Sequence, residues 1–71
     1  MLLVMTAAGP VILDVARDWW WPAGDATVPG EPMCGARAVV GEPLTVLVPD
    51  SGGPIGIRLV VGGRVSEIVE T

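Results

Sequence analysis

The sequence contains no histidine, lysine, asparagine, glutamine, tyrosine or phenylalanine. Histidine and lysine carry much of the proton transfer and covalent catalysis that proteins perform near neutral pH. Ser51 lies in a glycine-rich segment and has no histidine or lysine to activate it as a nucleophile. We therefore predict that the protein is not an enzyme and has no catalytic residues, no cofactor and no small-molecule substrate.

Cysteine is nearly absent, since Cys34 is the only one. One thiol cannot form a disulfide within the chain, and without histidine it cannot complete a four-ligand zinc site. A single cysteine in an apolar segment is typical of a buried, inert side chain, and a reactive thiol is the alternative. Asp14, Asp18 and Asp25 could offer carboxylates to Ca²⁺ or Mg²⁺, but their spacing fits no EF-hand loop and Arg17 lies among them. We interpret them as solvated charges and predict no metal site.

Positive charge is scarce, because four arginines stand against eight acidic residues and give a formal net charge of −4. Without a basic cluster, binding to nucleic acid or to an anionic membrane surface is not expected. The apolar run Met1–Leu13 is shorter than the ~20 residues of a membrane-spanning helix. It also lacks the positive charge that begins a secretory signal. We predict neither a signal peptide nor a transmembrane segment, and leave the location open between a virion and the cytoplasm.

Glycine and proline, by contrast, are abundant and separate several short apolar runs. The predicted strands are Met1–Ala8, Val11–Val15, Met33–Val40 and Leu44–Val48, and the predicted loops are Pro22–Pro32 and Pro49–Pro54. A helix over Val11–Trp21 is the alternative, because Ala16 and Arg17 favour helices. The pattern predicts one all-β domain, residues 1–71, in which five or six short strands form a small barrel or a compact sandwich.

The segment Ile55–Val69 has the strongest strand pattern in the chain. Gly62-Gly63 divides it into two β-rich halves, which predicts a C-terminal β-hairpin with a two-residue turn at these glycines. That register places Arg58 opposite Glu67, a favourable cross-strand pair. It also assigns one face to the core, made of Ile55, Ile57, Leu59, Val61 and Ile68.

Trp19, Trp20 and Trp21 are the least ordinary local feature. In an extended segment Trp19 and Trp21 share one face and Trp20 lies on the other. A domain of 71 residues has little room to bury three indoles on both sides of one segment. We therefore predict that the triplet contributes to an interface, a position in which tryptophan is enriched. The alternatives are a triplet wholly inside the core and a ligand-stacking site.

Apolar residues make up 51% of the chain, more than a domain of this size can hide in its own core. This surplus predicts a structural or interaction protein whose partners are copies of itself, a larger protein assembly, or both. Residues with A/T-rich codons are rare, which indicates a high-GC host and suggests a phage virion accessory protein such as a capsid decoration (cement) protein. A cellular source remains open. The alternative function is a small binding module, such as an inhibitor, an antitoxin-like partner or an accessory subunit, that docks a different protein through the tryptophans.

Overall fold

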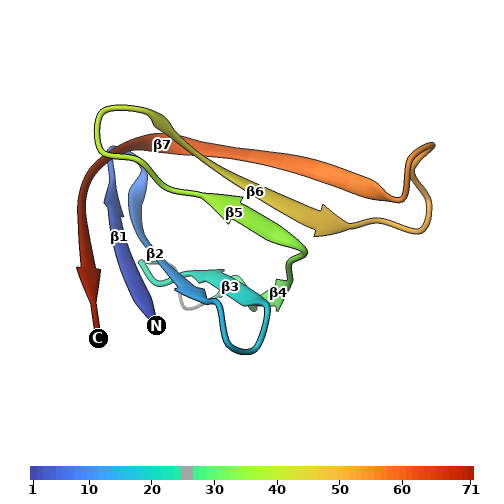
Figure 1. Ribbon diagram of the computed structural model, residues 1–71, viewed down its shortest axis with the longest axis horizontal. Helices are drawn as coiled ribbons and strands as arrows, with labels where there is room; N and C mark the ends of the chain where they lie inside the picture. The colour runs from blue at the N-terminus through green and yellow to red at the C-terminus, as the bar shows by residue number, and fades with distance from the viewer. Residues whose placement is uncertain (25–26) are drawn as a thin grey trace.

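Seven antiparallel strands form in the computed structural model, which describes residues 1–24 and 27–71 (Figure 1). They are β1 (Leu2–Thr6), β2 (Gly9–Asp14), β3 (Trp19–Pro22), β4 (Glu31–Pro32), β5 (Gly35–Arg37), β6 (Pro43–Pro49) and β7 (Ile57–Glu70). Their order in the sheet is β4-β3-β2-β1-β7-β6-β5, and the sheet curls into a half-barrel. The predicted all-β class is confirmed, with one or two more strands than expected. The additional short strand β4 lies at the end of the predicted loop Pro22–Pro32.

The helix considered over Val11–Trp21 is wrong, because this segment forms β2, a tight turn and β3. Asp18 closes the turn with φ of 52°, a left-handed conformation that aspartate tolerates better than most residues. The Asp14 carboxylate accepts a hydrogen bond from the Arg17 backbone N–H at 3.3 Å. Local turn chemistry therefore outweighs the helix propensity of the two residues at the centre of the segment.

The hairpin turn predicted at Gly62-Gly63 is also wrong, since both glycines lie inside the single long strand β7. Neither has the positive φ that a two-residue hairpin turn requires. Thr45 pairs with Val61 and Pro43 pairs with Arg64, so the two glycines together face one residue of β6. This arrangement is a β-bulge, which bends a strand and increases its twist. The hairpin turn lies at residues 50–56 instead, where the Asp50 N–H donates to the Gly56 carbonyl at 2.8 Å.

A close backbone contact explains the glycine at the second position of this bulge. A Cβ atom at Gly63 would lie 2.6 Å from the Ala8 nitrogen and 3.2 Å from the Ala7 nitrogen, both in the turn between β1 and β2. No side chain fits there without moving that turn. Beyond the bulge β7 leaves β6 and pairs with β1, so one strand belongs to both halves of the curled sheet.

The bulge also reverses the predicted orientation of β7. Val60 points inward and packs against the core, whereas Leu59 and Val61 point outward with 58% and 61% of their surface exposed. Ile55 and Ile57 are exposed as well, and of the predicted core face only Ile68 packs against the core. The face assignment failed because it rested on a turn that the chain does not make.

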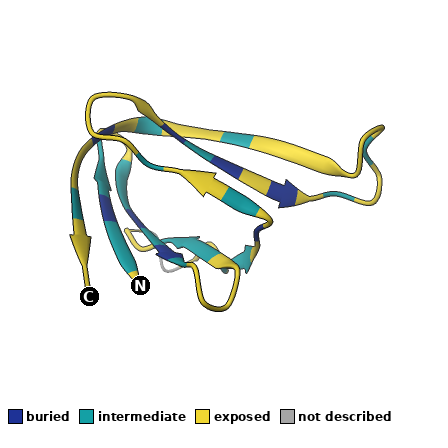
Figure 2. Cartoon of the chain, viewed as in Figure 1, coloured by how far each residue is buried: buried dark blue, intermediate teal, exposed yellow. Residues whose placement is uncertain are grey.

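The core is small and lies within the curl of the sheet (Figure 2). Its buried members are Val4, Val11, Leu13, Met33, Leu44, Val46, Val48 and Val65. The chain exposes 4518 Å² in total, compared with about 4,200 Å² for a typical monomer of its mass. The excess comes with large apolar side chains on the surface, as the composition predicts.

Candidate functional site

The three tryptophans alternate across β3 as expected for a strand. Trp20 is half-buried against the core, and its Nε1 is enclosed without a hydrogen-bond partner among the described residues. Trp19 has 38% of its surface exposed, and Trp21 is half-buried. The interface role predicted for Trp19, Trp20 and Trp21 stays a prediction, and Trp19 and Trp21 are the two that share the outer side of β3.

That face contains a pocket of about 340 Å³ lined by Asp14, Arg17, Trp19 and Trp21. The Arg17 Nε lies 3.8 Å from an Asp14 carboxylate oxygen, and the arginine side chain is 85% exposed, so this ion pair is weak. Trp19 is held by a neighbouring loop, because a Cβ atom at Gly30 would overlap its indole. The pocket offers aromatic surface and one loosely paired carboxylate.

A second pocket, of about 370 Å³, lies on the inner side of the curled sheet. Its walls include Val11, Trp20, Leu44, Val46 and Val60, and none of its lining residues within 1–24 and 27–71 is charged. The one hydroxyl at its edge, that of Thr6, already donates to the Gly9 carbonyl at 2.7 Å. This pocket is the apolar mouth of the half-barrel, and its described lining residues offer no acid or base for proton transfer.

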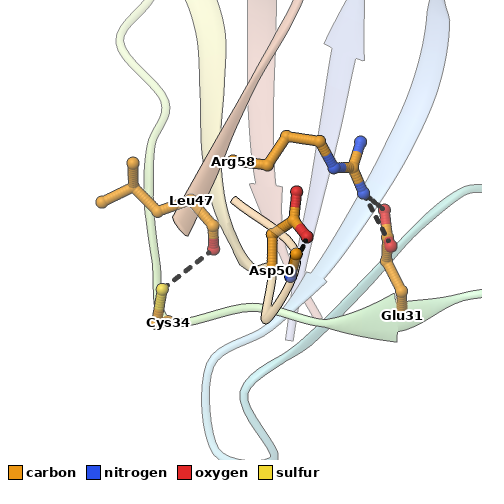
Figure 3. A network of polar contacts seen from close by, with 6 residues as sticks. Glu31, Cys34, Leu47, Asp50 and Arg58 are labelled. Carbon is orange, nitrogen blue, oxygen red and sulfur yellow. Dashed lines mark hydrogen bonds and ion pairs between the residues drawn. The ribbon is translucent and has the colours of Figure 1, made fainter. Parts of the chain in front are cut away.

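A salt bridge spans the open side of the half-barrel, between β7 and β4 (Figure 3). The Arg58 guanidinium on β7 lies 3.1 Å from a Glu31 carboxylate oxygen on β4. The expected partner of this arginine, Glu67, lies opposite Met5 of β1 instead. Arg58 therefore joins two strands that lie far apart in the order of the sheet.

We expect Glu31→Gln to reduce the free energy of unfolding by less than about 1 kcal/mol, because both partners are substantially exposed. The loss should shrink further in 1 M salt, which screens exposed charges. Urea unfolding at low and high salt measures both effects. The control is Arg17→Gln, which removes a different exposed ion pair, that of Arg17 with Asp14. A salt-independent loss above about 2 kcal/mol would show that this bridge holds the half-barrel closed.

The remaining candidate residues are scattered over the structure. Cys34 is exposed rather than buried, and its thiol donates to the Leu47 carbonyl at 3.4 Å (Figure 3). The burial expected for it fails because β5 is shorter than the predicted strand and begins at Gly35, one residue after Cys34. Asp25 lies outside the described residues. Over residues 1–24 and 27–71 no group of three histidine, cysteine, aspartate or glutamate side chains could hold a metal ion.

A row of exposed apolar side chains lies on the outer face of the β6–β7 hairpin. Leu47 pairs with Leu59, Thr45 with Val61 and Pro49 with Ile57, so these residues form adjacent cross-strand pairs. The outer hairpin face, as we name it, consists of Thr45, Leu47, Pro49, Ile57, Leu59 and Val61. Ile55, in the hairpin turn that follows, is 78% exposed. The sequence pattern does not indicate this surface, because the predicted hairpin turn at Gly62-Gly63 assigns these residues of β7 to the core.

In the part of the chain that the structure describes, no helix is long and apolar enough to span a membrane. Comparison of the chain with protein-family models, with curated proteins and with solved structures finds no match.

Proposed function

We propose that this chain is a non-enzymatic structural or interaction protein that associates through the outer hairpin face. Its partners are other copies of itself, a larger protein assembly, or both. The observation that carries the proposal is the row of exposed apolar cross-strand pairs on β6 and β7. Burying apolar surface contributes about 25 cal/mol per Å², so a continuous apolar row favours association.

The charge distribution on the hairpin supports this choice of surface. The outer hairpin face carries no charged side chain, since Arg58 on β7 points to the opposite side and pairs with Glu31. Arg37 on β5 lies beside Thr45 at one end of this face and is paired with Glu42. Depletion of charge is typical of the centre of a protein interface. The face with Trp19 and Trp21, by comparison, includes a carboxylate and an arginine.

The most specific form of the proposal is a decoration protein on the capsid of a phage with a high-GC host. Small size, the all-β fold, the mildly acidic composition and the codon bias support it. Cosedimentation of the purified protein with capsids of such a phage tests this form directly. The broader proposal does not depend on its outcome.

We expect Leu59→Glu to weaken association at least about tenfold, because it places an ionised carboxylate in an apolar contact that would otherwise exclude water. Sedimentation velocity at micromolar concentrations measures the change. Val15→Glu is the matched control, since Val15 is 62% exposed and lies in the turn between β2 and β3. This variant should associate like the unmodified protein.

Two results would contradict the proposal. One is an unmodified protein that stays monomeric at these concentrations and binds no larger assembly. The other is association that survives Leu59→Glu and is lost in Trp19→Ala, which would move the interface to β3 and favour a binding module that uses the tryptophans.

A further inference from the structure

The first half of β7 is an open sheet edge. Residues 57–61 pair with β6 on one side, whereas β1 pairs with β7 only from Val65 onward. Among the described residues no strand occupies the other side of this segment, and Figure 1 shows β7 running along the margin of the molecule there. Such an edge offers unpaired N–H and C=O groups to any strand that can lie beside it.

The register identifies which backbone groups face this edge. In an antiparallel ladder, residues that bond to the partner strand alternate with residues whose backbone groups point away from it. The Asp50 N–H donates to the Gly56 carbonyl, so the even-numbered residues Arg58 and Val60 are directed to β6. The N–H and C=O groups of Ile57, Leu59 and Val61 are therefore directed to the open edge.

Two of the devices that proteins use to protect an edge, proline and lysine, are missing from this segment, and a third, an inward-pointing charge, is present in Arg58 but is paired with Glu31. Proline, lysine and inward-pointing charges commonly prevent a strand from pairing with another chain. Residues 57–61 include no proline and no lysine, and their one charge, Arg58, has its partner Glu31 within the same chain. The bulge that bends β7 lies beyond this segment, at Gly62-Gly63, and leaves it extended.

We propose that β7 pairs with β7 of a second copy, antiparallel and about a two-fold axis at Leu59. This inference goes beyond the proposed function, because it joins two copies at the edge of β7 and leaves their outer hairpin faces uncovered for a further partner. Leu59 then faces Leu59 of the partner subunit, and Ile57 faces the partner subunit's Val61. The result is one continuous six-stranded sheet, β5-β6-β7 from each copy, with the two outer hairpin faces on the same side.

The pairing is self-complementary in both hydrogen bonds and charge. A two-fold axis at Leu59 brings together the residues whose backbone groups are free, so that each N–H meets a C=O. Arg58 faces Val60 of the partner subunit, so no like charges lie opposite each other. A two-fold contact of this kind uses the same patch on both copies and closes as a dimer, without open-ended stacking.

Cysteine crosslinking tests the register. In a Cys34→Ser background, Leu59→Cys places two thiols opposite each other, with Cα atoms about 5.5 Å apart, which is within the range of a disulfide. The matched control is Val61→Cys, which is equally exposed. Its thiol and that of the partner are offset by four residues, or about 13 Å, too far to join. Under mild oxidation we expect covalent dimer from Leu59→Cys and monomer from Val61→Cys.

Amide hydrogen exchange of the unmodified protein is a second measurement that needs no variant. Pairing protects the amides of Leu59 and Val61 at high concentration, and dilution restores fast exchange. Fast exchange at these amides in a sample that sedimentation shows to be associated would overturn the pairing, as would equal crosslinking of both cysteine variants. In either case association through the outer hairpin face would still stand, so failure of this inference is separable from failure of the proposed function.

Discussion

Trp20→Ala is expected to destabilise the protein by about 3 kcal/mol, the lower end of the usual cost of removing a large aromatic side chain from a core, because Trp20 is half-buried. Trp20 packs against the core cluster from β3, and its ring lines the mouth of the half-barrel. A domain of 71 residues has a total stability of about 4–11 kcal/mol. We therefore expect the variant to lose a large fraction of this stability, as measured by urea denaturation followed by circular dichroism.

Trp19→Ala is the control for the loss of an indole. Trp19 is the neighbouring residue on the same strand, but it lies on the outer face and does not pack against the buried cluster. Its removal should cost about 1 kcal/mol or less. Equal destabilisation by the two variants would contradict the assignment of Trp20 to the core. A loss of binding in Trp20→Ala is then no evidence for an interface, because unfolding alone removes any binding.

Gly63→Ala is expected to reduce the free energy of unfolding by about 1–3 kcal/mol, the range for forcing extra atoms into a packed site. The new methyl group would lie 2.6 Å from the Ala8 nitrogen, so the turn between β1 and β2 must move. The cost arises from this contact and not from backbone conformation, since Gly63 does not have a positive φ. Urea denaturation midpoints of the variant and the unmodified protein measure it.

Gly35→Ala separates this effect from the general consequences of replacing a strand glycine. Gly35 lies in β5, and a Cβ atom there meets only the Leu47 side chain at an ordinary 3.6 Å. We expect a change within about 0.5 kcal/mol. If Gly63→Ala is as mild as this control, the β1–β2 turn is not tightly packed on β7, and the bulge needs another explanation.

Local pattern predicted the all-β class, most of the turns and the alternation of the tryptophans. These features depend on neighbouring residues, such as the glycines and prolines between apolar runs or the two-residue period of β3. Asp18 in its left-handed conformation is likewise a local solution that the composition of the turn permits. The sequence signal and the structural cause lie within the same few residues.

The structural role of Gly62-Gly63 could not be predicted from neighbouring residues alone. A glycine pair between two β-rich halves is compatible with a hairpin turn and with a bulge in a continuous strand. The deciding contact is with Ala7 and Ala8, more than fifty residues earlier in the chain. Because this choice decides how the residues before the glycines pair, it also moved Leu59 and Val61 from the expected core to the surface, whereas Ile68, beyond a second irregularity at Ser66, packs against the core as predicted.

The candidate site was affected by the same error. The apolar surplus predicted an exposed apolar surface, and the tryptophan triplet was its predicted location. Trp20, the central tryptophan, packs against the core instead. The row on the β6–β7 hairpin follows from a register that only the position of the bulge sets. Composition therefore indicated that an exposed apolar surface exists, whereas its location required the pairing of strands.

The continuity of β7 has a consequence for how the molecule loses its structure. Because this strand supplies hydrogen-bond partners to β6 before the bulge and to β1 after it, neither half of the sheet has an independent set of neighbours. If the strand pairs of one half separate as far as the bulge, the other half loses the ordered β7 backbone with which it forms hydrogen bonds. The protein should therefore melt as one cooperative unit in spite of its open shape, with no stage at which one half persists alone.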